Sequence, residues 1–527
     1  MPTPTLRTPG VYVVEEPSGV RTITPVATSI TAFVGRALRG PTDRPVTVHS
    51  WADVERAFGG LWLESSLGYS LRDFFRLGGS SAVVVRAFES TDADASPDLD
   101  VARFSTADDP AAPGTADLAF VASSRGAWGA NLDVSVEDHA LTADPADGST
   151  LVNVVVQEHA PGQPTVVVRR EVHRNVSWDP TSSRRVDRVL DNESALLRLD
   201  GNLPTAAPAT KAAAHVDGSG TDGKQLTATT VEAALALLDQ AELVNLLVVP
   251  PYTKGDTDAG VLVTETGVEA STVTAMVEYA TRRDAMAILD PPADWDVSDA
   301  VDDQGDVAPN ERNAALYFPR IRQPDPLRPG QIGTFAPSGA VAGIIARTDA
   351  TRGVWKAPAG LDASIGGVTE LSVPLTDPQI GDLNVLGVNC LRKAPAAGHV
   401  IWGARTRQGN DVLASEWKYL PVRRTALFLK VSLFRGTQWV VFEPNDEPLW
   451  AQIRLNVGAF MDTLFRQGAF AGTTPKDAYF VKCDRETTTP DDVNLGVVNI
   501  WVGFAPLKPA EFVVIHLQQM AGQAGGA

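Results

Sequence analysis

The chain of 527 residues is 44% hydrophobic and 21% charged, a composition typical of a soluble protein with about two to four domains. Its net charge of −19 argues against general nucleic-acid binding. The charge is uneven, because residues 391–527 carry a net charge of +3 and the remainder carries −22. We therefore expect the C-terminal part to face an acidic partner.

The N-terminal part predicts an extended arm followed by an α/β layer. Residues 1–25 form the arm, with "GVYVVEE" (10–16) as a strand between two prolines. Residues 26–90 alternate strands and helices, and Ser50 with Asp53 gives the start signal of a helix. The expected elements are the strand "SITAFVG" (29–35), the helices "WADVERAF" (51–58) and "LGYSLRDFFRLGG" (67–79), and the buried strand "AVVVRAF" (82–88).

The middle of the chain changes composition twice. Residues 91–230 predict an inserted, mostly antiparallel β-domain, whose last part, 203–229, is low in complexity and predicts a linker. Residues 231–383 alternate short apolar strands with helices, which indicates a parallel sheet covered on both faces. Its strands are "LVNLLVVPP" (243–251), "AMAILDPP" (285–292) and "NAALYFPRI" (313–321), and its helices are "TVTAMVEYATRRD" (272–284) and "GAVAGIIARTDATRG" (339–353).

The C-terminal part predicts an α+β domain over 384–505 and an arm with a flexible tail over 506–527. We expect strands at 399–404, 438–443, 478–484 and 497–504, a helix at 447–468, and a helix or a strand at 424–434. A last strand follows Pro506 and Pro509, and both of its faces are apolar over 511–517. Such a strand needs cover on both faces, from its own chain or from another one.

No motif supports catalysis. Residues 218–225, "GSGTDGKQ", come close to a phosphate-binding loop, but Gln225 replaces the hydroxyl that would meet Mg²⁺, so we interpret them as a Gly-rich turn. Cys390, Cys483 and the seven histidines have no metal-ligand spacing, and two cysteines favour a reducing compartment. Acidic runs such as "ADWDVSDAVDD" (293–303) are interpreted as solvated loops. No apolar run approaches ~20 residues, so we expect no membrane insertion.

Several segments resemble the contractile tail sheath family of phage tails, R-type bacteriocins and contractile injection systems. The resemblance covers both ends and most of the middle of the chain, with "KAPAAGH" (393–399) as a departure from the family pattern. The segments are "TPGVYVVEEPSGVRTITPVATSITAFVGRALRGP" (8–41), "AWGANLDVSV" (127–136), "GSGTDG" (218–223), "LVNLLVVPP" (243–251), "AMAILDPP" (285–292), "AGHVIWGARTR" (397–407), "YLPVRRTALFLKVSLFRGTQWVVFEPNDEPLW" (419–450), "GAFAGTTPKDAYFVKCDRET" (468–487) and "GVVNIWVGFAPLKPAEFVVIHLQQ" (496–519).

The resemblance implies a structural, non-enzymatic protein of α/β and α+β multidomain class. Its central layer would be a subtilisin-like scaffold without catalytic function, and no cofactor is expected. Subunits would assemble in a bacterial cytoplasm, stack as hexameric rings around an inner tube, meet baseplate and terminal cap proteins, and contract to drive the tube through a target envelope. Other self-assembling shells and an α/β hydrolase with a β insertion stay open as alternatives, and one chain does not separate a phage tail from a domesticated particle.

Two sets of residues are candidate contact sites. The strands at both ends would be donated to neighbouring subunits, because an added strand is held by backbone hydrogen bonds while its linker moves. On the helix 447–467, an apolar stripe and two arginines, Arg454 and Arg466, suggest a contact with the inner tube. The arm residues are Val11, Tyr12, Val13, Val14, Phe512, Val513, Val514, Ile515 and Leu517.

Overall fold

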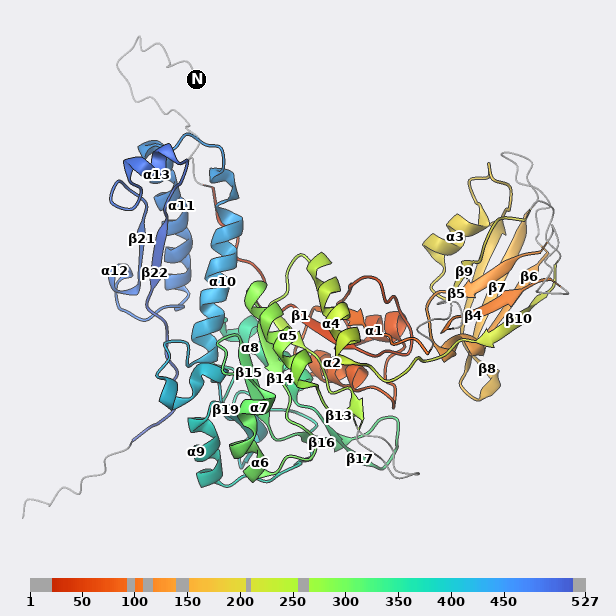
Figure 1. Ribbon diagram of the computed structural model, residues 1–527, viewed down its shortest axis with the longest axis horizontal. Helices are drawn as coiled ribbons and strands as arrows, with labels where there is room; N and C mark the ends of the chain where they lie inside the picture. The colour runs from red at the N-terminus through yellow and green to blue at the C-terminus, as the bar shows by residue number, and fades with distance from the viewer. Residues whose placement is uncertain are drawn as a thin grey trace, which may run out of the picture. The chain divides into compact units, whose positions relative to one another are not determined.

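The computed structural model describes residues 21–91, 100–107, 117–138, 151–204, 210–254 and 265–514 (Figure 1). The chain divides into two units by its internal contacts. One unit comprises residues 27–424, and the other combines the residues up to 26 with those from 425 onward. The mixed α/β multidomain class predicted from the sequence is confirmed.

The larger unit is built around an eight-stranded sheet of order β2-β3-β1-β11-β14-β15-β19-β20. The six inner strands are parallel, and the edge strands β2 and β20 pair antiparallel. Most of the inner strands are apolar runs because both faces are covered, whereas β19 also contains Asn389, Arg392 and Lys393. The strands are β1 (Thr31–Gly35), β2 (Val46–Val48), β3 (Ala82–Arg86), β11 (Leu246–Val248), β14 (Met286–Leu289), β15 (Ala314–Phe318), β19 (Val388–Ala394) and β20 (Gly398–Ile401).

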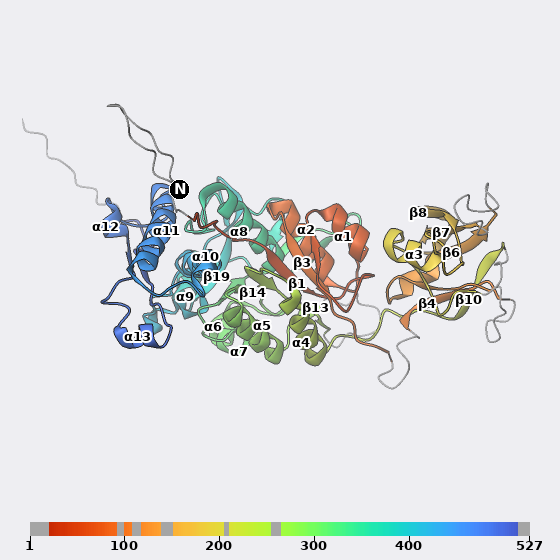
Figure 2. The ribbon, with the colours of Figure 1, turned by 90° about the horizontal axis from the view of Figure 1, so that it is seen from above.

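Helices cover both faces of this sheet, as Figure 2 shows. On one face α2 packs closely against α8, because a Cβ on Gly339 would lie 2.3 Å from the carbonyl oxygen of Ser70. On the other face α4, α5 and α9 share one apolar core with the strands. The described helices of this unit outside the β insertion are α1 (Trp51–Phe58), α2 (Ser66–Leu77), α4 (Ala228–Leu237), α5 (Ala270–Arg282), α6 (Val297–Asp302), α7 (Gln304–Val307), α8 (Ser338–Arg352) and α9 (Asp377–Val385).

Smaller elements complete the larger unit. A three-stranded sheet of order β17-β16-β18 and a two-stranded pair, β12 with β13, stand outside the central sheet. As predicted, the Ser50 hydroxyl caps α1 by accepting the Asp53 N–H. The short strands are β12 (Thr253–Lys254), β13 (Glu265–Gly267), β16 (Ile321–Pro324), β17 (Ile332–Phe335) and β18 (Glu370–Leu371).

The predicted β insertion is a seven-stranded antiparallel sheet of order β8-β7-β6-β10-β4-β5-β9 with its own apolar core. Helix α3 (Val186–Glu193) contacts both edge strands, so the sheet curls toward closure. The carboxylate of Asp100 accepts hydrogen bonds from Ser90, Thr91 and Thr221, which holds both ends of the insertion together. The strands are β4 (Ala102–Ser105), β5 (Ala119–Ala122), β6 (Leu132–Glu137), β7 (Val152–Ala160), β8 (Gln163–Val176), β9 (Leu197–Leu199) and β10 (Ala212–Ser219).

The structure corrects three predictions about this part of the chain. The predicted linker 203–229 contains β10, an Ala-rich strand whose place in the sheet overrides its weak propensity. Helix α4 begins at Ala228 and packs in the central core, so the insertion ends before the predicted residue 230. The predicted boundary at 384 is also misplaced, because β19 and β20 belong to the central sheet and the division falls at 424.

Both places where the chain crosses between the units lie beside one buried carboxylate of the larger unit. Asp349 on α8 accepts two hydrogen bonds from the guanidinium of Arg424, of 2.8 and 2.6 Å, and one of 2.6 Å from the Thr28 hydroxyl. Arg424 also donates to the carbonyl oxygen of Thr28. The two charged side chains are only 3% and 4% exposed, so each depends on the other for compensation.

Removing this carboxylate should destabilise the protein strongly. Asp349→Asn leaves Arg424 buried without a counter-charge, and we expect a loss of about 3–5 kcal/mol in the free energy of unfolding. Thr28→Val removes one hydrogen bond and should cost about 1 kcal/mol. Urea unfolding measures both changes, with Asp362→Asn, in an exposed pair with Arg352, as the matched control. A loss in Asp349→Asn no larger than in the control would contradict this assignment.

Deleting the whole insertion should leave a folded protein, whereas deleting only a part of it should not. Joining Asp100 to Gly220 through a short Gly/Ser linker deletes the entire sheet and keeps the hydrogen bonds of Asp100, so the remainder should fold. Replacing only 140–215 removes β7, β8, β9 and the first half of β10, which leaves β4 and β6 with unpaired edges, so this variant should aggregate. Circular dichroism and sedimentation distinguish the folded variant from the aggregating one. If the variant that lacks the whole insertion unfolds, the insertion is required for folding and the prediction is wrong.

Candidate functional site

The C-terminal unit presents a small open sheet on a helical layer. Helix α11 (Glu447–Arg466) contacts β21 (Tyr479–Lys482), which pairs antiparallel with β22 (Trp501–Phe504). Helix α10 (Leu420–Gly436) lies behind α11, with the rings of Phe428 and Phe460 in contact. Figure 1 shows this order of layers, with the short helices α12 (Pro475–Ala478) and α13 (Pro490–Asn494) in the connections.

The first described residues of the chain belong to this unit, although they lie far from it in sequence. The Arg21 N–H donates to the side chain of Asn456 on α11, and the Val26 N–H donates to the Ser432 hydroxyl on α10. Ile23 is buried against Gly436, where any side chain would collide with it. The N-terminal segment is therefore anchored at residue 21. Val11, Tyr12, Val13 and Val14 lie outside the described residues.

The sheet has one covered face and one exposed face. On the covered face, Phe470 packs against both Tyr479 and Phe504, a directly opposed cross-strand pair. On the other face, the Phe480 ring lies across Gly503, where a Cβ would come within 2.2 Å of it. Phe480 is 51% exposed and Trp501 is 60% exposed. The exposed face therefore offers two aromatic rings to a partner.

Both strands of this sheet also have an unpaired edge. Among the described residues β21 and β22 have no third strand beside them, so each uses the hydrogen-bonding groups of one side only. A two-stranded sheet is marginal by itself and presents a template for another strand. The unit thus contains an incomplete sheet with an apolar face and two free edges.

The predicted terminal strand forms no strand pairing over residues 512–514. Among the described residues no strand lies beside this segment, and the side chains of Phe512, Val513 and Val514 are 77%, 81% and 75% exposed. Ile515 and Leu517 lie outside the described residues. The sequence left open whether this apolar segment is covered by its own chain or by another one. The described part of its own chain leaves it uncovered.

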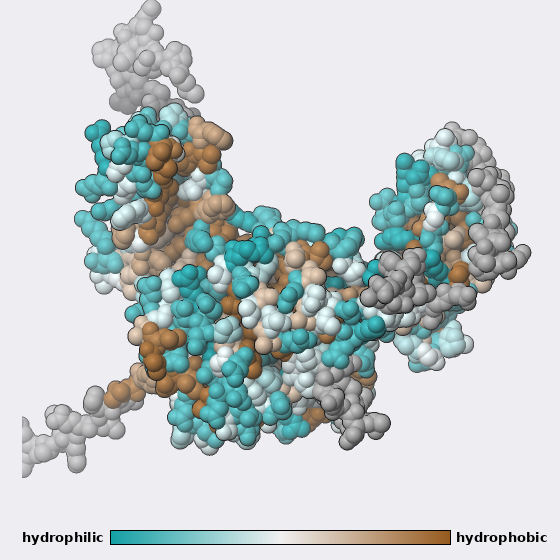
Figure 3. Space-filling view, viewed as in Figure 1, coloured by the Kyte–Doolittle hydropathy of each residue, from teal (hydrophilic) through white to brown (hydrophobic). Residues whose placement is uncertain are grey.

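Further apolar side chains are exposed in the same unit, and Figure 3 shows apolar surface gathered on its visible face. Phe442 is fully exposed and stands at a positive φ of 70°. The prediction of a strand at 438–443 is wrong, because residues 438–440 form a 3-10 turn. Residues 424–434, predicted to be a helix or a strand, are helical and belong to α10. Outside the sheet and the terminal segment, the exposed apolar residues described in this unit include Phe434, Val441, Phe442, Leu455, Leu495 and Val497.

The apolar stripe predicted on α11 serves the core of its own unit. Leu449, Ile453, Val457, Phe460 and Leu464 are all buried, so this face is not available to a partner. Arg454 donates to the carbonyl oxygen of Cys483 and to Glu447, which fixes it within the unit. Arg466 is different: its side chain is 78% exposed and forms an ion pair with Asp462 of the same helix.

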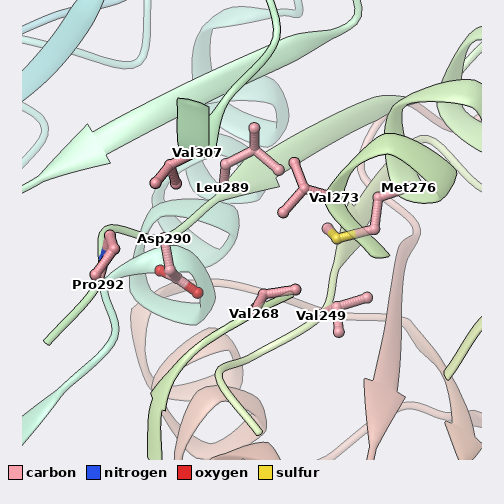
Figure 4. A pocket seen from close by; sticks show the side chains of 8 residues that line it. All are labelled: Val249, Val268, Val273, Met276, Leu289, Asp290, Pro292 and Val307. Atoms are coloured by element: carbon pink, nitrogen blue, oxygen red, sulfur yellow. The ribbon is translucent and has the colours of Figure 1, made fainter. Parts of the chain in front are cut away.

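A pocket at the carboxyl ends of β11 and β14 is where a parallel α/β sheet would hold a substrate (Figure 4). Its volume of about 20 Å³ admits little more than a water molecule. Its one charged residue is Asp290, whose carboxylate accepts the N–H and the hydroxyl of Ser338 at the start of α8. Burial raises the pKa of Asp290 to about 6. The group caps a helix in a space too small for a substrate.

The other candidate binding motifs are structural. The turn at 218–225 is held by its neighbours, because the Asp222 side chain accepts the Ala127 N–H and the Lys224 N–H donates to the Glu89 carbonyl. The described residues contain no cluster of histidine, cysteine and acidic side chains able to hold a metal ion, and Cys390 and Cys483 are buried free thiols. Over the same residues, no helix is long and apolar enough to cross a membrane.

Comparison with known proteins points to one family. The sequence models of the phage tail sheath protein central domain and C-terminal domain match residues 258–407 and 414–519. The chain is 28% identical over 183 residues to the tail sheath protein of Vibrio phage KVP40 and 24% identical over 188 residues to that of Enterobacteria phage T4. These matches cover 34% and 36% of this chain but only 26% and 27% of those relatives.

Solved sheath structures share the fold over nearly the whole chain. The contracted helical sheath of the anti-feeding prophage aligns with a TM-score of 0.57 at 20% identity, covering 98% of this chain and 100% of that chain. The contracted sheath of the extracellular contractile injection system PVC gives 0.58 at 20% identity, covering 98% and 99%. A sheath tail protein from Listeria innocua gives 0.58 at 12% identity, covering 92% and 96%. These likenesses show the fold, and the two matched domain models with the two tail sheath relatives show that the chain belongs to the tail sheath family.

Proposed function

We propose that the chain is a sheath subunit of a contractile injection apparatus. Subunits assemble as hexameric rings, stack helically around an inner tube, and contract to drive that tube through a target envelope. The observation that carries the proposal is the incomplete sheet of the C-terminal unit together with an uncovered apolar segment, Phe512–Val514, of the same chain. Sheath polymers and baseplate complexes among the structural neighbours support self-assembly and a baseplate partner.

In this proposal the terminal segments are strands that complete the sheet of a neighbouring subunit. A donated strand is held by backbone hydrogen bonds, each of which nets about 0.5–1.5 kcal/mol, and several bonds per strand act together around a ring. The receiving edges are those of β21 and β22. The N-terminal residues Val11–Val14 would form the second donated strand.

Subunits linked in this way can change their packing without separating. The linker that contains Pro506 and Pro509 absorbs the movement, while the donated strand stays paired. The energy of contraction would be stored during assembly in the bacterial cytoplasm, and inner tube, baseplate and terminal cap proteins would be the partners. Arg466 remains a candidate for contact with an acidic tube, because it is the exposed member of the predicted pair.

Shortening the C-terminal arm should abolish assembly without unfolding the subunit. Within the described part of the chain residues 512–514 pair with no strand, so a protein lacking 508–527 should keep a near-native melting temperature and form no long tubes in negative-stain microscopy. Removing only 520–527 keeps the apolar strand and is the matched control. Val514→Pro, which deletes one backbone donor, should weaken assembly selectively. An arm-deleted chain that unfolds would mean that the strand completes its own core.

A structural role for Asp290 predicts a particular pH dependence. The raised pKa means that the folded state binds the proton more tightly than the unfolded state, so the contribution of Asp290 to stability is greatest at low pH and falls as pH rises from about 4 to about 6. The fall is bounded by about 3 kcal/mol. Asp290→Asn should remove this fall, apart from a constant offset, and should leave tube formation intact. Parallel pH profiles of unfolding for the two proteins would refute the assignment.

A further inference from the structure

A basic cavity lies between the three-stranded sheet and the far edge of the central sheet. Its volume is about 440 Å³, and it is lined by β16, the segment around β18, and the β19–β20 hairpin. The hairpin contains residues 393–399, which depart from the family pattern at the sequence level. The lining residues that carry charge are Arg322, Glu370, Arg392, Lys393 and His399.

The cations of this cavity outnumber its carboxylates. Arg322 pairs with Glu370 at 2.8 Å, and Arg392 pairs with Asp377 at 2.8 Å while its guanidinium lies over the Trp402 ring. Lys393 is exposed and has no carboxylate partner among the described residues. The cavity therefore has an uncompensated positive charge.

Two further contacts give the cavity a fixed shape. Lys393 stands directly opposite His399 in the β19–β20 pair. The Nδ1 atom of His399 lies 3.1 Å from the carbonyl oxygen of Val368, which holds the imidazole ring against the wall. An anionic group that entered would meet Lys393 without first displacing an internal carboxylate, and the hydroxyl-bearing residues Thr369 and Ser372 line the same space.

The complementary charge is present on the same chain. Residues 294–306 contain six aspartates and no lysine or arginine. They were predicted to be a solvated loop, but they form the short helices α6 and α7, with Asp296 capping α6. Within the described part of the chain, none of the six aspartates forms an ion pair with a cation. Five are exposed and Asp299 is half-buried: Asp294, Asp296, Asp299, Asp302, Asp303 and Asp306.

We propose that this basic cavity binds the acidic segment 294–306 of a neighbouring copy of the same chain. The inference rests on the proposed self-assembly and specifies a second contact, separate from the donated strands. A cavity on one subunit that takes a different surface of the next is a heterologous contact, the kind that builds helical stacks. Its charge pairs would be screened by salt, whereas strand addition would be much less affected.

Charge reversal tests the contact in tube assembly. Lys393→Glu should raise the critical concentration for assembly roughly threefold to tenfold at about 50 mM salt, and less at about 0.5 M. Asp302→Lys with Asp303→Lys should have a similar effect. Combining all three substitutions should restore assembly to within about twofold of the unmodified chain, because the pair is re-formed with reversed signs. Sedimentation with electron microscopy measures the concentration, and circular dichroism checks the fold.

Controls make the outcome specific. Lys224→Glu changes an exposed lysine that lies outside the cavity and has no ion pair among the described residues, and this variant should assemble normally. Unaltered assembly of Lys393→Glu, or a triple variant no better than its parents, would overturn the contact while leaving the sheath function standing. An unmodified chain that forms no tubes would contradict the proposed function instead. A second test measures binding of a synthetic peptide of residues 292–308 to the subunit. Salt-sensitive binding that Lys393→Glu abolishes would support the contact, and a peptide that does not bind would refute it.

Discussion

The buried ion pair between Asp349 and Arg424 controls both positions at which the chain passes from one unit to the other. Thr28 follows the first crossing and Arg424 precedes the second, and the Asp349 carboxylate binds both residues. A buried pair of this kind adds little net stability over an apolar replacement, but losing one partner is costly. In this protein the main effect of the ion pair is to hold two chain segments in place. It fixes where the N-terminal segment leaves the larger unit and where α10 begins its passage into the smaller one.

The smaller unit has the features of a structure that is finished by other molecules. Its sheet has two strands, its exposed face carries Phe480 and Trp501, and Phe442 points into solvent without cover. A monomer gains nothing from such exposure, which lowers solubility and invites edge pairing. The larger unit contrasts with it, because its parallel sheet is covered on both faces and edged by antiparallel strands. The division separates a unit whose main sheet is covered on both faces from a unit whose sheet has an exposed face.

Much of the fold was readable from the sequence, and the errors have physical causes. Inner strands such as Ala82–Arg86 are continuous apolar runs and were predicted correctly. Strand β19 was missed because Asn389 and two basic residues interrupt its pattern, although Asn389 is buried and binds the backbone of Arg405. Arg405 itself resembles a surface residue in sequence but is fully buried, donating to carbonyl oxygens of its own unit. Single-residue hydrophobicity does not reveal such internal use of an arginine.

The candidate site was predictable only in part. The apolar terminal strand and its proline-rich linker were visible in the sequence, because alternation and proline spacing are local signals. The stripe on α11 was also visible, but a stripe does not say whether it packs inward or outward, and here it packs inward. The basic cavity was not predicted from the sequence. Arg322 and Lys393 are distant in the chain and meet only through the packing of two sheets.

The length of the chain after β22 places a geometric limit on any assembly that uses the arm. From Phe504 to Phe512 there are eight residue steps, which span at most about 28 Å when fully extended. The two prolines favour the extended end of that range. A receiving edge must therefore stay within this radius of its donor in every state of the particle. The length of this segment would therefore limit the pitch and the twist of a contracting lattice, in addition to any limit set by the affinity between subunits.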